Sequence, residues 1–351
     1  MRQAIDIIKQ WATRQWKVWK PQILRCWSIF KSRASQFWHV WTARENRWLS
    51  GPVTAAALMV LLVCVKSCQG IVYSHSDECR IYRLGYPIDD ARALVAVLTD
   101  KQAQSLIAHG EHDTIAIPII HQRYFIARNF EHYLAFHKAD TTAAPLADIV
   151  AIVNVGRYPE SKESAVPCDT SKGLLMLVNG RHYLDQSYKP DSLVEFKKLY
   201  CYEHQKAHRV VVDAFIEMQR ECKEQTSAKI MVNSAYRSFQ DQTGTYRRND
   251  KRYAAPPGHS EHQTGLAIDV TSLQHPEKWS FGKSTEGVWL RENCHKFGFI
   301  LRYPEKQSHI LGYSYEPWHL RYVGVETAKQ IHDEGITLEE YYAYYIDRDK
   351  E

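Results

Sequence analysis

The feature that most constrains this chain is an uncharged run between Arg47 and Lys66. Its 18 residues read WLSGPVTAAALMVLLVCV. As an α-helix they would rise about 27 Å, close to the roughly 30 Å hydrocarbon core of a bilayer. We therefore expect a transmembrane anchor within residues 48–73, which separates a short N-terminal segment from a long body.

Charge is distributed unevenly on the two sides of this run. Residues 1–50 hold ten Lys and Arg against two Asp and Glu, a formal charge of +8, so the rest of the chain sums to −3 of the total of +5. Cations ahead of a membrane span favour the cytoplasmic side, so we expect the N-terminus inside and the body outside. The body has no basic signature, and no nucleic-acid partner is expected.

Two other interpretations of the run are a cleaved signal peptide and a lipoprotein signal. A 47-residue segment ahead of the run is too long for a signal peptide, and no A-x-A-like site follows. The residue before Cys64 is Val63, where a lipoprotein signal has a small residue. We favour a retained anchor.

Residues 1–47 form a basic, Trp-rich segment that includes six of the chain's ten tryptophans. Apolar residues recur there at steps of three, four or seven, a helical stripe that Pro21 interrupts. The stripe consists of Trp16, Trp19, Ile23, Trp27, Phe30, Phe37 and Trp41. This pattern favours an interfacial helix on an anionic inner leaflet. A basic tail that only sets topology is the alternative.

Five cysteines follow the anchor, and an odd number argues against a complete disulfide framework. Cys201 and Cys222 also flank a predicted helix of about 30 Å, far beyond the roughly 7 Å Cα separation that a bridge allows. We expect free, partly buried thiols. The five are Cys79, Cys168, Cys201, Cys222 and Cys294.

The body divides into a mostly helical region, 74–155, and a second domain, 156–351. In the first, Asp89 and Thr99 are predicted helix N-caps and Gly110 is a predicted stop. The second mixes helices and short strands without a βαβ rhythm, which is typical of an α+β fold with a small antiparallel sheet flanked by helices. We predict helices at 203–225, at 285–297 before Gly298 and ahead of Gly335, and strands at 266–271, 299–303 and 319–323.

The stretch GHSEHQTGLAID (258–269) is the strongest candidate in the sequence for a catalytic or metal-binding site. Strand alternation puts Leu266 and Ile268 on one face and Asp269 on the other, where it can reach a group held by the preceding loop. His262 lies on that loop. Nitrogen and carboxylate ligands together suit zinc, and a catalytic zinc usually has three protein ligands.

A third ligand should come from a distant element, and His319 in EPWH (316–319) is the best candidate. Glu316 beside it could act as a general base. His259 and His309 are rival ligands. For each residue taken alone, the alternative is a structural role, as a histidine of the core or as a hydrogen-bonded cap.

Three separated segments resemble the VanY-type D-alanyl-D-alanine carboxypeptidases, which are zinc enzymes that trim peptidoglycan stems. The segments are SAYRSFQDQ (234–242), SEHQTGLAID (260–269) and YEPWHLRYVG (315–324). The resemblance covers about residues 170–335. It extends more weakly upstream, through 84–91 and 174–194, to membrane-anchored members of that family.

The resemblance implies one zinc per chain, with His262, Asp269 and His319 as its ligands. It implies that Glu316 is the catalytic base, which takes a proton from the attacking water and passes it to the leaving amine. Residues 156–351 would then be a zinc carboxypeptidase domain that acts on peptidoglycan stem peptides.

The resemblance also implies substrate contacts. Arg237 would receive the terminal carboxylate, which suits an exopeptidase. Gln242 and Ser260 would make polar contacts, and Trp318 would line the pocket. The alternative for Arg237 is a buried ion pair that holds its own loop.

Two rival functions have weaker support. Ser280 and Lys283 fit the S-x-x-K pattern of serine D-Ala-D-Ala peptidases, but no K-T-G or S-D-N follows. A catalytically silent module that binds the cell wall would require a broken site, whereas all three ligands and the base are present. Cleavage of D,D pentapeptides and of L,D tetrapeptides would use the same metal site.

Overall fold

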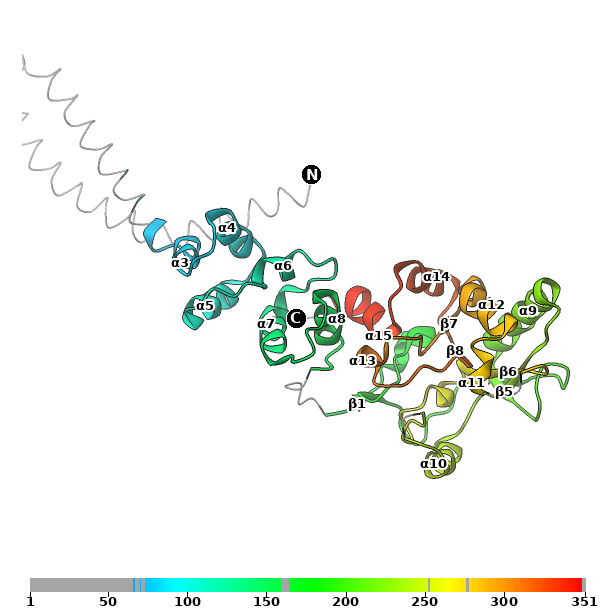
Figure 1. The fold of residues 1–351 in the computed structure, drawn as a ribbon. Helices are drawn as coiled ribbons and strands as arrows, with labels where there is room; N and C mark the ends of the chain where they lie inside the picture. The colour runs from blue at the N-terminus through cyan, green and yellow to red at the C-terminus, as the bar shows by residue number, and fades with distance from the viewer. Residues whose placement is uncertain are drawn as a thin grey trace, which may run out of the picture. The chain divides into compact units, whose positions relative to one another are not determined.

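The chain forms two compact units that divide between His121 and Gln122. The computed structural model (Figure 1) describes residues 66, 70, 73–158, 164–251, 253–275 and 278–348. The predicted segments 1–47 and 48–73 lie outside these residues, apart from Lys66, Gly70 and Tyr73. Among the described residues, no helix has both the length and the apolar character that a bilayer span needs.

The first unit consists of short helices joined by tight turns. They are α3 (Asp77–Arg83), α4 (Ile88–Val97), α5 (Asp100–His109) and α6 (Ala116–Ile120). Thr99 caps α5 as predicted, because its hydroxyl accepts from the backbone of Gln102 while the Gln102 side chain accepts from the backbone of Thr99. Gly110 ends α5 with a φ of 74°. The prediction for Asp89 was wrong: α4 starts after Pro87, so Asp89 lies within its first turn, where the helix dipole favours a carboxylate.

The second unit opens with α7 (Phe130–Ala139) and α8 (Leu146–Asn154), so the region 74–155 is mostly helical, as predicted. Ala151 and Ile152 of α8 pack against Ile310. The other helices of this unit are α9 (Arg209–Thr226), α10 (Phe239–Arg248), α11 (Lys278–Phe281), α12 (Thr285–Asn293), α13 (Ser308–Leu311), α14 (Val325–Glu334) and α15 (Leu338–Tyr341). Short 3-10 turns are η2 (Ala127–Asn129), η3 (Thr170–Leu175), η4 (Glu261–Thr264) and η5 (Cys294–Phe297), and a π turn, η6, covers Tyr342–Ile346.

A four-stranded antiparallel sheet is the frame of the second unit, with the strand order β5-β6-β8-β7. Its strands are β5 (Ile230–Ser234), β6 (Ala267–Ser272), β7 (Phe299–Leu301) and β8 (His319–Tyr322). Two small pairs accompany it: β1 (Val166–Pro167) with β2 (His182–Tyr183), and β3 (Leu193–Glu195) with β4 (Lys206–His208). The predicted α+β fold with a small antiparallel sheet is confirmed.

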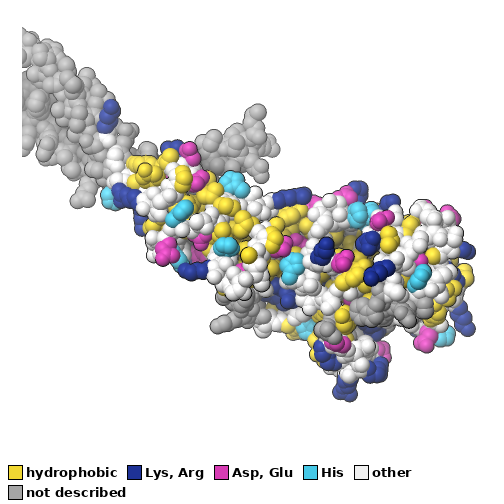
Figure 2. Space-filling model, viewed as in Figure 1, with side chains coloured by type: hydrophobic (Ala, Val, Ile, Leu, Met, Phe, Trp, Pro, Cys, Tyr) yellow, Lys and Arg dark blue, Asp and Glu magenta, His cyan; other side chains and the backbone are white. Residues whose placement is uncertain are grey.

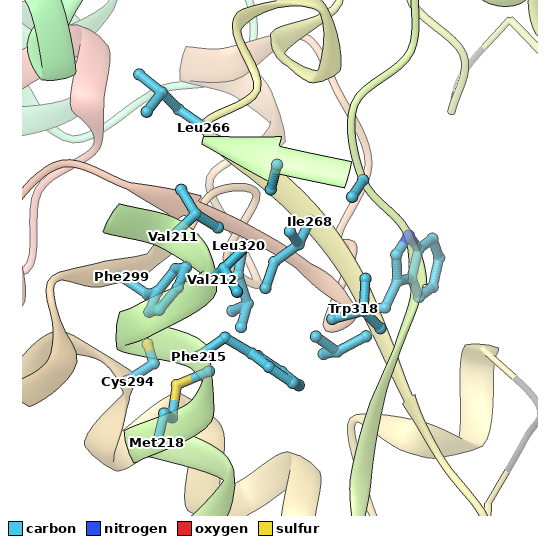
Figure 3. Packing of buried hydrophobic residues seen from close by; sticks show 14 of the residues in the cluster. Val211, Val212, Phe215, Met218, Leu266, Ile268, Cys294, Phe299, Trp318 and Leu320 are labelled. Carbon is cyan, nitrogen blue, oxygen red and sulfur yellow. The ribbon is translucent and has the colours of Figure 1, made fainter. Parts of the chain in front are cut away.

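Helix α9 covers one face of this sheet and builds the main core. Its buried residues recur at steps of three and four, the spacing of one helical face. Figure 3 shows side chains of this face beside those of the sheet. The residues labelled there are Val211, Val212, Phe215 and Met218 from α9, with Leu266, Ile268, Phe299, Trp318, Leu320 and Cys294. All six residues of β6 are buried, so the strand that carries Asp269 is fixed on both faces.

Local pairing shifts one predicted boundary. The helix predicted at 203–225 begins only at Arg209, because residues 206–208 pair with 193–195 as a strand. Gly298 and Gly335 end their helical segments with φ values of 82° and 65°, as predicted.

The five cysteines that follow the predicted anchor are free in the structure, as predicted, and all five are buried rather than partly buried. Burial raises the pKa of the Cys294 thiol to about 12 and those of Cys168 and Cys222 to about 11. Thiols held protonated in this way are unreactive.

On the face shown in Figure 2, Lys and Arg side chains of the second unit are interspersed with Asp and Glu.

Candidate metal centre

A tight turn ahead of β6 carries the first predicted ligand. The 3-10 turn η4 is closed by Gly265, whose φ is 71°. The left-handed conformation favours glycine here, and a Cβ would also lie 3.0 Å from the side chain of Leu193, which would have to shift. The turn leaves His262 only 2% exposed, next to the strand that follows.

The antiparallel register brings the other two predicted ligands together. Asp269 of β6 is the direct partner of His319 of β8, although 50 residues separate them in sequence. The Asp269 Oδ1 atom lies 3.0 Å from Nδ1 of His319 and 3.4 Å from Nε2 of His262. One ligand atom from each of the three buried side chains lies within 4.8 Å of the others. Three such atoms converging on one point can hold a single metal ion.

Hydrogen bonds select which nitrogen each ring presents. The Nδ1 atom of His262 lies 2.6 Å from the carbonyl oxygen of Ala235 and can donate to it, which leaves Nε2 for the cluster. His319 is turned the other way, with Nδ1 toward Asp269. The two rings lie 4.9 Å apart at 82° to each other.

The protonation of the three residues follows from burial and from their neighbours. Burial, together with the nearby Arg237 cation, lowers the pKa of His262 to about 4. Burial would also lower the pKa of His319, but its contacts with Asp269 and Glu261 raise it to about 9. Burial would raise the pKa of Asp269, but the two histidines hold it well below its usual range. The cluster therefore contains one carboxylate, one neutral imidazole and, without a metal, one imidazolium.

Glu316 lies beside the cluster but outside it. Its Oε2 atom is 3.9 Å from Nδ1 of His319, and its side chain is buried. Its backbone amide donates to the carbonyl of Tyr303, and its own carbonyl accepts from the amide of His319. A carboxylate fixed just outside the ligand set can act on a water molecule there.

Arg237 lies on the other side of Asp269, with Nη1 3.8 Å from Oδ2. Its Nε atom donates to the Gln242 side chain at 2.9 Å, and Nη1 donates to the hydroxyl of Ser234 at 2.6 Å. The Gln242 amide in turn donates to the carbonyl of Ala255. The Arg237 side chain is 20% exposed, so its guanidinium is held by Gln242 and Ser234 on one side and is partly open to solvent. Burial lowers the pKa of Arg237 below its ordinary value.

The remaining predicted residues lie in different surroundings. Ser260 is buried at the start of η4, and Trp318 is 3% exposed, within the hydrophobic core cluster shown in Figure 3. His259 lies outside the cluster, with Nδ1 2.7 Å from the carbonyl of Asn179. His309 lies 3.5 Å from Asp148, also away from the cluster.

The S-x-x-K match lies on the surface. Ser280 and Lys283 are both exposed, and the backbone amide of Lys283 donates to the carbonyl of Ser280 in a turn. A nucleophile of this type needs a base in a shielded site, so the match is not supported.

A buried network behind His319 was not predicted from the sequence. Glu261 accepts through Oε1 from Arg302 and from Arg321, at 2.8 Å each. Arg302 also donates to both carboxylate oxygens of Glu339, at 2.9 and 2.6 Å. Burial would raise the pKa of Glu261, but the two arginines hold it well below its usual range. The available signal was an arginine at the second position after His319, which strand alternation puts on the same face.

The model of the VanY family, described as D-alanyl-D-alanine carboxypeptidase, matches residues 204–325. The Bacillus subtilis protein YodJ is 37% identical over 185 residues, which span 49% of this chain and 67% of YodJ. A D-alanyl-D-alanine carboxypeptidase of Enterococcus faecium is 34% identical over 185 residues, 49% of this chain and 58% of that one.

Among solved structures, an LD-carboxypeptidase, LdcB, is similar. It has 34% sequence identity and a TM-score of 0.48, covering 51% of this chain and 90% of the LdcB chain. The residues that match the family model, 204–325, include η4, β6 and β8, the elements that carry the three clustered residues.

Proposed function

This chain belongs to the VanY family of D-alanyl-D-alanine carboxypeptidases, and from that premise we propose that it is a zinc-dependent enzyme that removes the C-terminal D-alanine from peptidoglycan stem peptides. The observation that carries the proposal is the buried cluster of His262, Asp269 and His319. Family membership supplies the reaction class, and the cluster supplies a place for the metal.

The donor set fits zinc. Two imidazole nitrogens and one carboxylate oxygen are borderline-soft and hard donors that zinc accepts together, and three protein ligands leave a position open for chemistry. A zinc ion held there supplies Lewis-acid polarisation to the scissile carbonyl and to the attacking water. The Ala235 carbonyl keeps the Nε2 lone pair of His262 available for this role.

Glu316 is the general base of the proposed reaction. Its carboxylate takes a proton from water as the oxygen adds to the carbonyl carbon of the terminal peptide bond. It returns that proton to the nitrogen of the leaving D-alanine as the C–N bond breaks. Its burial and its 3.9 Å separation from His319 support this role.

Arg237 is the proposed recognition group for the free C-terminus. Its planar fork fits a carboxylate bidentately, and Gln242 and Ser234 orient it from one side. Gln242 and Ser260 are proposed polar contacts to the peptide, and Trp318 a wall of the pocket. An enzyme that requires a carboxylate at this position removes only the last residue.

The substrate is proposed to be a stem pentapeptide that ends in D-Ala-D-Ala, with L,D cleavage of tetrapeptides as the second candidate. The Enterococcus faecium relative is a D-alanyl-D-alanine carboxypeptidase, whereas LdcB is an LD-carboxypeptidase. Release of D-alanine by the purified full chain from the two peptides, offered separately, tests this. Release from neither peptide would favour the silent wall-binding module.

The location is proposed from the sequence. Residues 48–73 would anchor the chain in the membrane, with residues 1–47 cytoplasmic and the catalytic domain outside. This arrangement puts the enzyme on the side of the membrane where peptidoglycan lies.

A further inference from the structure

Two buried atoms behind the metal cluster face each other without a hydrogen bond. The Nε2 atom of His319 lies 3.6 Å from Oε2 of Glu261. Neither atom has a hydrogen-bond partner among the described residues, although both are fully shielded from solvent. A buried donor and a buried acceptor without hydrogen bonds cost free energy. A small adjustment of the ring that brings the two atoms into a hydrogen bond is therefore favoured.

The other oxygen of Glu261 is held in place from two directions. It accepts from Nε of Arg302 and from Nη1 of Arg321. Arg321 also donates through Nη2 to the carbonyls of Leu174 and Met176, at 2.9 and 2.8 Å. These contacts hold Oε1, and the other oxygen, Oε2, faces the His319 ring.

In each histidine of the cluster one ring nitrogen faces the cluster and the other faces an acceptor, but the two rings use opposite nitrogens. A neutral imidazole has one N–H, and a histidine that binds metal through one nitrogen donates the other to an acceptor that fixes its tautomer. For His262 the acceptor is the Ala235 carbonyl, reached from Nδ1. For His319, whose Nδ1 faces Asp269, the acceptor must be reached from Nε2, and Glu261 is the group that lies there.

We propose that Glu261 is a positioning residue that accepts the Nε2 proton of His319 and so directs the Nδ1 lone pair toward the metal. The inference rests on the proposed zinc site and deepens it. The network extends the support of that site to α15, because Arg302 connects Glu261 to Glu339.

The test compares two variants of the full chain, Glu261→Gln and Glu339→Gln. Each removes one negative charge from Arg302. Glu261 also accepts from Arg321, and only the first variant acts on His319. The readout is the zinc dissociation constant, measured by chelator competition on protein that circular dichroism shows to be folded. We expect about 10- to 100-fold weaker zinc binding for Glu261→Gln, the usual effect of losing such a partner, and unchanged binding for Glu339→Gln.

The outcomes separate this inference from the function. Wild-type chain that binds no zinc would overturn both. Wild-type chain that binds zinc, with both variants weakened alike or neither weakened, would overturn the role of Glu261 and leave the carboxypeptidase assignment standing.

A second measurement uses the wild-type chain, so it does not depend on whether a variant without the Glu261 carboxylate folds. Nitrogen-15 NMR of histidine rings in the zinc-loaded wild-type chain reports which nitrogen of each ring holds a proton. We expect a protonated, hydrogen-bonded Nε2 for His319 and metal at Nδ1. A proton on Nδ1 of the His319 ring, with metal at Nε2, would overturn the proposal.

Discussion

Asp269 and His319 face each other across the antiparallel pair β6 and β8, with Oδ1 3.0 Å from Nδ1. Since each residue is fixed by the hydrogen bonds of its own strand, the separation of these two proposed ligands is a property of the sheet. Only His262 depends on a turn, and Gly265 fixes that turn.

Replacing Glu316 with Gln should separate the base from the ligands. The substitution keeps size and hydrogen bonding but removes the group that takes the proton, so the turnover number should fall by about two to four orders of magnitude. Zinc content should stay near one per chain, because Glu316 lies outside the cluster. Zinc loss in Glu316→Gln, measured by atomic absorption, would make Glu316 a ligand and the proposed ligand set wrong.

Replacing Arg237 with Ala should change what the enzyme selects. The guanidinium is the proposed partner of the free carboxylate, so kcat/KM for a peptide acid should fall much more than kcat/KM for its C-terminal amide. Arg247, exposed on α10, offers a matched control whose loss should change neither value. An unchanged preference for the acid in Arg237→Ala would favour a purely structural role in its loop.

Zinc affinity should rise with pH. In the metal-free chain the pKa of His319 is about 9, because its contacts with Asp269 and Glu261 outweigh the effect of burial. The ring is therefore protonated at neutral pH and must release a proton to bind metal. His262, with a pKa of about 4, is already neutral. We expect about tenfold tighter binding per pH unit below pH 9.

Isothermal titration calorimetry in two buffers of different ionisation enthalpy measures this release directly. Near pH 7 it should report about one proton released per zinc bound. Zinc binding without proton release would contradict the assigned protonation of His319.

How much of this could be predicted differs from residue to residue. The His262 and Asp269 pair was visible because the motif is local: strand alternation turns Asp269 toward the loop. The pairing of β6 with β8 is not local, so the residues alone made His319 the best candidate beside the rivals His259 and His309, and the resemblance to a known family decided among them. Thr99 and Gly110 were predictable because a cap is set by a few adjacent residues.

The network behind the site was not predictable in the same way. Glu261 stands inside the motif, but its partners Arg302 and Arg321 follow it by 41 and 60 residues. Nothing in a single sequence distinguishes a buried arginine from an exposed one until the strands are paired. The early start predicted for α9 failed for a related reason, since residues 206–208 form a strand only because residues 193–195 lie beside them.

Membrane topology gives an independent prediction. A reagent that cannot cross membranes should label a cysteine placed at His75, which is exposed just after the proposed anchor, and miss one placed at Ser35. The background chain should carry Ser in place of Cys26, Cys64 and Cys68, while the buried cysteines can stay. Intact cells supply the test, and permeabilised cells the control in which both positions react. Labelling at Ser35 alone would invert the orientation.

A comparison of His262→Ala with His259→Ala tests whether His262, Asp269 and His319 hold the zinc on which peptide cleavage depends. Both variants lose an imidazole within one short segment, but only His262 belongs to the cluster, whereas His259 contacts the carbonyl of Asn179. Zinc per chain and D-alanine released from the pentapeptide are measured on the same preparations. We expect His262→Ala to lose both and His259→Ala to keep both. A His262→Ala protein that retains a full zinc and its activity would contradict the proposed zinc site.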